Sequence, residues 1–281
     1  MKTSTLVSVA HAGGQGKTTV AQMLFLAAKK AGFAYKMVAA DFLDQNGRSK
    51  LGKLYPDKVE EYGVGAQLIA ARTQNNANAA VRYWDRIGHV FLEGGHVIDV
   101  GANVIPSLID WALDRHLASL LEKQSAPKVE FFCVCKAERH AVDDMVELVS
   151  RLAAQRPFRN SRFFIVKNEV GGSFDSLEIE KKLSQAFPNE NIVYLNMPKC
   201  QSEIWPAMET KGLSIEHVLG MDEDQAVAGL DVDIWTASAG LAELRSWFDN
   251  FISTIRSSDV LPRGETNLVN IKGRRGSSQA E

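Results

Sequence analysis

The sequence has few cysteines, no long apolar run and no excess of either charge. Three cysteines occur in 281 residues, at Cys133, Cys135 and Cys200. So small and odd a number offers no disulfide framework and is typical of a reducing compartment. A chain of this length buries roughly three quarters of the surface that it exposes when unfolded, so its core needs no disulfide or metal. We therefore expect a cytoplasmic protein.

Membrane and export signals are missing as well. No apolar stretch reaches the roughly 20 residues of a membrane-spanning helix. A weak signal-peptide pattern at residues 1–10 is too short, and it leads directly into a glycine-rich segment. Lys and Arg number 32 and Asp and Glu number 34, which gives a formal net charge of −2. This balance excludes a polycation that coats DNA, although it leaves room for a local basic patch.

The sequence does contain a regular alternation of short apolar runs and helical patterns. The apolar runs predict strands at 6–10, 35–40, 96–100, 129–135, 162–167 and 192–197. Apolar residues at helical spacing predict helices at about 18–31, 64–83, 106–122, 140–155, 174–187 and 238–256. Strands that are apolar on both faces and alternate with helices indicate a parallel sheet covered on both sides. We therefore predict an α/β fold, with a mostly parallel, doubly wound sheet flanked by helices.

The pattern predicts one domain over residues 1–257. Within it, the stretch 220–237 contains five acidic residues and little periodicity, which predicts an acidic surface insertion. Residues 258–281 are polar and include Lys272, Arg274 and Arg275. This composition predicts a disordered, basic-polar tail. The tail has no amphipathic apolar face, so we expect no membrane contact through it.

One glycine-rich segment lies between the first predicted strand and the first predicted helix. It consists of Gly13, Gly14, Gln15, Gly16, Lys17, Thr18 and Thr19. In this context, glycines let successive backbone N–H groups point into one concavity that binds phosphates. We expect Lys17 to reach the terminal phosphates and Thr18 to offer its hydroxyl to Mg²⁺. All seven residues are predicted nucleotide-binding residues of a P-loop NTPase, and residues 1–257 its nucleotide-binding domain. The alternative is a glycine-rich turn that precedes a lysine by chance.

The segment resembles the deviant Walker A loop of the ParA/MinD family, which reads Lys-Gly-Gly-x-Gly-Lys-Thr/Ser. The strict P-loop pattern would place a glycine at His11, so it fails by one residue. In the family, the first lysine of the loop reaches across a dimer to the partner's nucleotide. Here that position is Ala12. The resemblance therefore implies ATP and Mg²⁺ as cofactors, but without this signature lysine.

Two further strand ends fit the family. Asp41 and Gln45 match its Asp-x-Asp-Pro-Gln pattern after the second strand, whereas the second aspartate position is Leu43. Asp44, one residue out of register, is the nearest substitute for positioning the attacking water. We predict Asp41 and Asp44, with Lys17, as catalytic residues, although Asp-Gln-Asn-Gly is also a good turn sequence.

Asp99, at the end of an apolar strand, resembles the Walker B aspartate. Thr18, Asp41 and Asp99 are therefore the predicted Mg²⁺ residues.

The last two predicted strands end in residues that could contact the base. Asn168 resembles the family's adenine-reading asparagine, because its amide can both donate and accept hydrogen bonds. Pro198 and Lys199 resemble the loop that packs on the base. Ligands of open parallel sheets bind at the carboxyl ends of the strands, which favours all three positions. Asparagine also caps strands routinely, so a purely structural role is the alternative.

Three functional interpretations follow. The first is an ATP-dependent switch of the ParA/MinD type that forms a homodimer with nucleotide and acts on a DNA-bound or conjugation partner protein, with weak nonspecific DNA contact through the tail. The motifs resemble most the plasmid stability and conjugative transfer branch, which includes StbB- and TraL-like proteins. The second is a metabolic P-loop kinase, which would need an arginine-rich lid. Its candidate lid residues, Arg151, Arg156, Arg159 and Arg162, are near one another in the sequence, but they flank a helix and a strand of the family pattern. The third is a nucleotide-binding scaffold that does not hydrolyse ATP.

Overall fold

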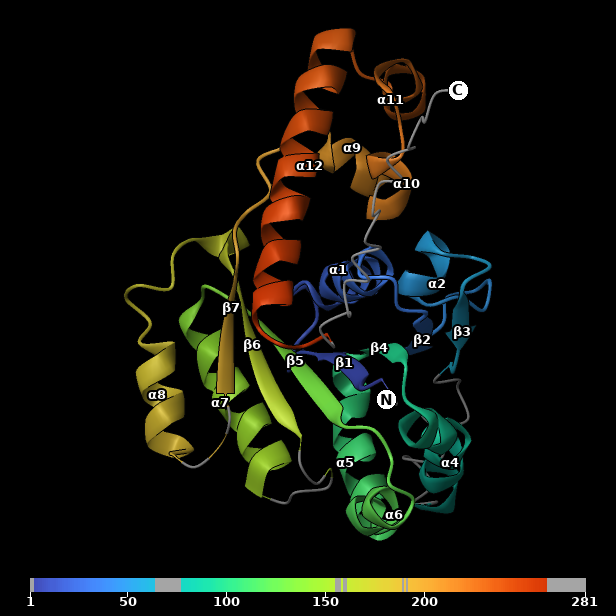
Figure 1. Cartoon of the computed structure of the whole chain (residues 1–281), viewed down its shortest axis with the longest axis vertical. Helices are drawn as coiled ribbons and strands as arrows, with labels where there is room; N and C mark the ends of the chain where they lie inside the picture. Colours follow the sequence, from blue (N-terminus) through green and yellow to red (C-terminus); the bar gives the residue numbers. More distant parts are fainter. Residues whose placement is uncertain are drawn as a thin grey trace, which may run out of the picture.

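The computed structural model describes residues 3–63, 77–154, 158, 161–188, 190 and 192–261 (Figure 1). Within this part of the chain, seven strands form one sheet in the order β3-β2-β4-β1-β5-β6-β7. Every neighbouring pair is parallel. The α/β prediction with a parallel, helix-flanked sheet is therefore confirmed, and the sheet is parallel throughout.

The strands are β1 (Thr5–Val9), β2 (Lys36–Ala40), β3 (Val59–Glu61), β4 (His96–Val100), β5 (Val129–Lys136), β6 (Arg162–Asn168) and β7 (Ile192–Met197). All six predicted strands are found. No strand was predicted at β3, which pairs with β2 at the edge of the sheet. It has three residues, two of them glutamates, so no apolar run marks it.

The helices are α1 (Lys17–Lys30), α2 (Lys50–Leu54), α4 (Ala77–Glu93), α5 (Ile105–Asp114), α6 (Leu117–Lys123), α7 (Arg139–Ala154), α8 (Ile179–Ala186), α9 (Trp205–Thr210), α10 (Ile215–Leu219), α11 (Glu223–Leu230) and α12 (Ile234–Ser257). Short 3₁₀ turns follow β4 and β6. Residues 64–76 of the helix predicted at 64–83 lie outside the described residues, and the remainder is the start of α4.

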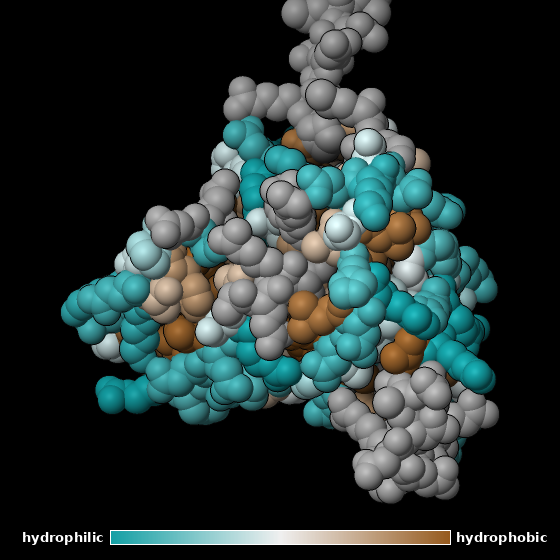
Figure 2. All heavy atoms as spheres, turned by 90° about the horizontal axis from the view of Figure 1, so that it is seen from below, coloured by the Kyte–Doolittle hydropathy of each residue, from teal (hydrophilic) through white to brown (hydrophobic). Residues whose placement is uncertain are grey.

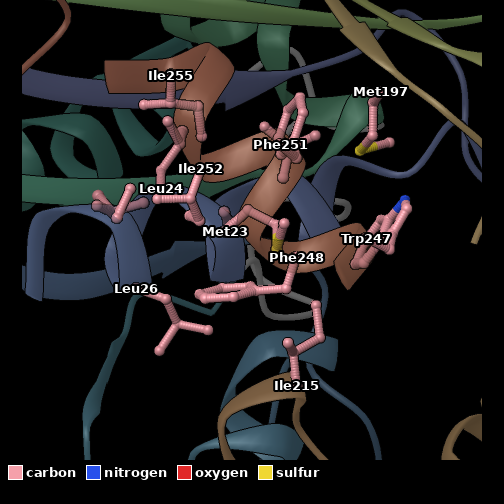
Figure 3. Close-up of a cluster of buried hydrophobic side chains, with 14 of the residues drawn as sticks. Met23, Leu24, Leu26, Met197, Ile215, Trp247, Phe248, Phe251, Ile252 and Ile255 are labelled. Atoms are coloured by element: carbon pink, nitrogen blue, oxygen red, sulfur yellow. The ribbon is translucent and has the colours of Figure 1, made fainter. Parts of the chain in front are cut away.

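Two apolar clusters lie on opposite faces of the sheet, because successive strand residues point to opposite sides. One contains Val7 and Val9 of β1 with side chains of α4 to α8. The other contains Leu6 of the same strand with side chains of α1, α2 and α9 to α12. In Figure 3, Phe248 and Ile252 of α12 lie beside the α1 side chains that belong to the same cluster, so α12 covers the helix that follows the glycine-rich loop.

The acidic stretch 220–237 forms ordered secondary structure that the sequence analysis did not predict. It contains α11, which begins with a capping box between Asp222 and Gln225. The side chains of Ala226 and Leu230 are buried in the same cluster as α12. Helix α12 begins at Ile234, four residues before the predicted start, because Asp233 caps the N–H groups of the first turn.

The chain after α12 is buried at first. Val260 and Leu261, which fall in the predicted tail, have exposed fractions of 2% and 6%. They pack in the cluster that contains α1 and α12, as expected for an apolar pair that follows a core helix. The tail prediction is therefore wrong for these two residues. Residues 262–281, including the three basic residues, lie outside the described residues.

In the described part of the chain, no helix is both long and apolar enough to cross a membrane. Figure 2 shows the molecule from below, on the side opposite α11, as mostly hydrophilic residues with small separate hydrophobic areas. Large exposed apolar side chains are few among the described residues, and the most exposed is Trp235 at the start of α12, at 82%.

Candidate functional site

The glycine-rich loop joins the carboxyl end of β1 to α1. Gly14 and Gly16 have φ values of +74° and +102°, a backbone region that side chains disfavour. A Cβ atom at Gly16 would lie 2.6 Å from Nδ2 of Asn168. Glycine is thus required at this position both for its backbone conformation and for the close approach of β6.

Gly16→Ala tests this packing. We expect the substitution to destabilise the protein by about 1–2 kcal/mol, because alanine strains the left-handed backbone and displaces Asn168. Urea unfolding measures the loss. Gly13→Ala is the matched control, because Gly13 has no positive φ and its added Cβ would meet nothing within 4 Å. Equal stability of the two variants would contradict the loop geometry.

Three hydrogen bonds, two of them buried and one partly buried, fix the loop to β1, β5 and β6. Ser8 Oγ donates to the Lys17 carbonyl oxygen at 2.9 Å. The Lys136 N–H at the end of β5 donates to Gln15 Oε1 at 2.8 Å. The Asn168 amide donates to the Gln15 carbonyl oxygen at 2.9 Å. The Gln15 side chain therefore holds the loop against the sheet, and Gln15, a predicted nucleotide-binding residue, is not among the residues that line the cavity described below.

Thr18 and Asp99 meet behind the loop. Thr18 Oγ1 donates to Asp99 Oδ2 at 2.8 Å. Asp99 is 2% exposed, and its Oδ1 atom is buried without a hydrogen-bond partner. Burial raises the pKa of this carboxyl, whereas the nearby Lys17 and the hydrogen bond from Thr18 lower it. A hydroxyl and a carboxylate with an unused oxygen are the donors that Mg²⁺ prefers, so the pair fits such an ion.

The described residues contain no group of three or more His, Cys, Asp or Glu side chains that could hold a metal. A divalent ion bound here would therefore need phosphate oxygens or water to complete its coordination. This is the usual situation for Mg²⁺ bound together with a nucleotide. The predicted metal residues Thr18 and Asp99 are thus brought together by the fold.

Asp41 also lies at this edge of the sheet. It lines the cavity, and Oδ1 accepts a hydrogen bond from the Phe42 N–H at 2.7 Å. A Cβ atom at Gly101, just after β4, would lie 2.1 Å from that same oxygen. The absence of a side chain at Gly101 therefore lets the ends of β2 and β4 approach each other, with Asp41 and Asp99 on neighbouring strands.

The structure does not bring Asp44 into the site. Its Oδ1 accepts hydrogen bonds from the N–H groups of Asn46 and Arg48, at 2.9 and 3.0 Å. Its Oδ2 pairs with Lys53 Nζ at 2.8 Å, and this contact holds the pKa of the carboxyl below its ordinary value. Asp44 is not among the cavity residues. The carboxylate organises the turn, the structural alternative that the Asp-Gln-Asn-Gly sequence suggested.

A cavity of about 500 Å³ opens above the loop. Its lining consists of Gly13, Gly14, Gly16, Lys17, Thr18, Thr19, Asp41, Lys50, Lys136, Asn168, Val170, Met197, Pro198, Lys199, Cys200, Trp205, Glu209 and Trp247. Four of these side chains are lysines and two are acidic, so the lining is cationic on balance. Such a lining suits a polyanion like a nucleoside triphosphate.

Several cavity residues were missed by the sequence analysis. Lys50 begins α2 and Lys136 ends β5, and neither stands at a spacing that a motif would reveal. The sequence pattern predicts Trp247 as an ordinary core residue of α12. In the structure its Nε1 donates to the Pro198 carbonyl oxygen at 2.7 Å and fixes the loop after β7. Trp205 packs against it at a ring-centroid distance of 5.3 Å. Tertiary packing, rather than sequence spacing, gathers these side chains.

Asn168 is largely engaged within the protein. Besides its bond to Gln15, its Oδ1 accepts from the Val170 N–H at 3.2 Å, so the amide has one N–H left for a ligand. We expect Asn168→Ala to weaken ATP and GTP binding by the same factor, roughly 2- to 13-fold, because the loop loses a supporting hydrogen bond. Competition of both nucleotides against a fluorescent analogue measures this. A loss confined to ATP would instead support the adenine-reading role.

Comparisons with known proteins find similar folds only. No model of a protein family and no curated protein sequence matches the chain. Solved structures of similar fold include a MinC:MinD cell division complex from Aquifex aeolicus, at 12% identity over 88% of this chain and 96% of that one, with a TM-score of 0.43. A ParA family ATPase from Chlorobium tepidum TLS has 13% identity over 87% and 99%, with a TM-score of 0.44.

The similarity extends to other proteins. The signal recognition particle receptor FtsY from Elizabethkingia anophelis has 12% identity over 88% of this chain and 66% of its own, with a TM-score of 0.39. The chain thus has structural similarity to ParA and MinD ATPases at low identity. At these values the similarity describes the general fold and assigns no function.

Proposed function

We propose that the protein binds ATP with Mg²⁺ and acts as a nucleotide-dependent switch. The observation that carries the proposal is the contact between Thr18 and the buried Asp99, next to a cationic cavity that Thr18 and Lys17 line. A lysine, a hydroxyl and a carboxylate at a strand-to-helix loop are the groups that hold the terminal phosphates of a nucleotide and its metal ion.

Each residue has a distinct task in this proposal. The backbone N–H groups of the glycine-rich loop and the start of α1 bind the phosphates, and Lys17 neutralises the terminal ones. Thr18 and Asp99 hold the Mg²⁺, with Asp41 on the neighbouring strand orienting its water shell. The ion would neutralise charge on the phosphate oxygens. Pro198 and Lys199 form the wall on the side of the base, with Asn168 supporting the loop beneath it.

The site is less well equipped to hydrolyse ATP than to bind it. Ala12 offers no cation, and Asp44 is engaged in its own turn, so two groups that the motif resemblance assigns to catalysis are absent from the cavity lining. We therefore infer that binding of ATP, more than its hydrolysis, changes the state of the protein.

The partner and the process are a further part of the proposal. A homodimer formed with ATP, acting on a DNA-bound protein in plasmid stability or conjugative transfer, is what the loop motifs suggest. Sedimentation of the purified protein with ATP, with ADP and without nucleotide, each with and without DNA, tests it. A heavier species with ATP alone would support the switch, and identical sedimentation in all conditions would contradict it.

A kinase is the second candidate, because another cavity of about 400 Å³ adjoins the first and shares Thr18, Thr19 and Lys50 with it. An acceptor molecule could occupy it. Two of the candidate lid arginines, however, lie away from the carboxyl ends of the strands, where the cavity is, and neither lines it. Arg162 begins β6 and binds Glu130, and Arg151 lies in the last turn of α7. Arg156 and Arg159 fall outside the described residues.

A further inference from the structure

Lys50 is the first residue of α2 and lines both the cavity above the loop and the adjoining one. Its side chain is exposed, and among the described residues no ion pair involves it. Lys53, one turn later, lines only the adjoining cavity of the two and is paired with Asp44. Of these two lysines, Lys50 is therefore the one whose charge is available to a ligand in the main cavity.

The position of Lys50 relative to the loop indicates which part of a nucleotide it would meet. Lys50 follows β2, on the same side of the loop as Asp41, and its charge acts on the buried carboxyl of Asp99. Lys136, the last residue of β5, and Lys199, just after β7, line the other side of the cavity. Because Asp99 and Thr18 mark the metal end of the site, Lys50 lies at the end where the terminal phosphate would be.

The backbone that carries Lys50 is held in place. Ser49 caps α2 by accepting the Gly52 N–H at 3.0 Å, and its own N–H and hydroxyl both donate to Glu61 Oε1 of β3 at 3.1 Å. A flexible four-carbon side chain on a fixed helix start can reach an anion in the cavity without any movement of α2.

We propose that Lys50 binds the γ-phosphate of ATP from within the same chain and so distinguishes ATP from ADP. The proposal rests on the proposed function. It gives the protein a cation at the terminal phosphate although position 12 is alanine. It also makes α2 and the β2–α2 segment the part of the chain whose contacts differ between the two nucleotides.

The test compares the dissociation constants of ATP and ADP, each with Mg²⁺, by calorimetric titration. Lys50→Ala is expected to weaken ATP binding at least about tenfold, because a charge-assisted contact is lost, and to change ADP binding less than about twofold. Lys50→Arg keeps the charge and should retain most of the preference for ATP. Lys36→Ala is the control, since it removes an exposed lysine at the amino end of β2.

Each pattern of results has a distinct meaning. If the wild type binds nucleotide and Lys50→Ala weakens ATP and ADP equally, or weakens neither, the role of Lys50 is overturned while the proposed function stands. If Lys36→Ala lowers ATP affinity as much as Lys50→Ala does, the effect is one of net charge and the proposal fails. If the wild type binds neither nucleotide, the proposed function fails with it. Thermal unfolding of each variant verifies that it is folded.

Discussion

The purified protein is expected to hydrolyse ATP very slowly. In the ParA/MinD family, whose loop motif the sequence resembles, a loop lysine supplies positive charge to the transferring phosphate from the opposite subunit. This chain has Ala12 at that position. A cation supplied at that point accelerates phosphoryl transfer by about 10³–10⁵-fold. Lys50 in our proposal contacts the bound γ-phosphate, but Asp44, which we predicted to position the attacking water, is held in its own turn and does not line the cavity.

Steady-state phosphate release from the isolated chain measures this turnover. Asp44→Ala is the informative control, because the structure places that carboxylate in a turn with Lys53. We expect the variant to retain the slow rate of the wild type. Fast turnover by the wild type that Asp44→Ala abolishes would mean that Asp44 reaches the nucleotide after all. Fast turnover that survives the substitution would mean that another group replaces the missing lysine.

Lys17→Ala is expected to cost about 1.5–3 kcal/mol of ATP binding, roughly a 10- to 150-fold loss of affinity. Lys17 is 9% exposed, lines the cavity at the start of α1, and lies close enough to Asp99 to lower the pKa of that carboxyl. Its removal leaves the phosphates without their nearest cation. It also leaves the buried carboxylate without its strongest counter-charge, so we expect some loss of stability too.

Equilibrium dialysis with labelled ATP gives the affinity, and urea unfolding without nucleotide gives the stability. Lys17→Arg separates the two effects, because it keeps the charge next to Asp99 but carries a bulkier head into the phosphate cradle. We expect it to unfold like the wild type and still bind ATP more weakly. Unchanged ATP affinity in Lys17→Ala would contradict the assignment of the glycine-rich loop as the ATP-binding site.

Local sequence patterns predict most of the fold. Buried strands of a parallel sheet are continuous apolar runs, so six of the seven strands can be predicted from the sequence. The exception is β3. β3 carries two glutamates and forms because β2 offers it an edge. Helix α11 depends on its capping box and on the burial of Ala226 and Leu230 in the cluster that contains α12. Apolar residues at helical spacing are too few in this segment to predict it.

The candidate site likewise contains residues that the sequence predicts and residues whose role depends on tertiary structure. The loop residues are predictable because a strand, a fixed spacing and a helix hold them together locally. Asp99 lies 81 residues from Thr18, but it is predictable because it ends an apolar strand whose carboxyl end faces the loop. The roles of Asp44 and Asn168 depend on hydrogen bonds to the backbone at Arg48 and Gln15, which only the folded chain reveals. Lys50 and Trp205 come to the cavity from separate elements, so their contribution is a matter of packing.

Calorimetric titration of the wild type with ATP, in Mg²⁺ and again with the metal chelated, measures whether the protein binds this nucleotide together with the ion. We expect saturable binding of one ATP per chain that weakens when Mg²⁺ is removed, because Thr18 and the unpaired oxygen of Asp99 then lose the ion that links them to the phosphates. Absence of ATP binding in both conditions, or binding that is indifferent to Mg²⁺, would contradict it.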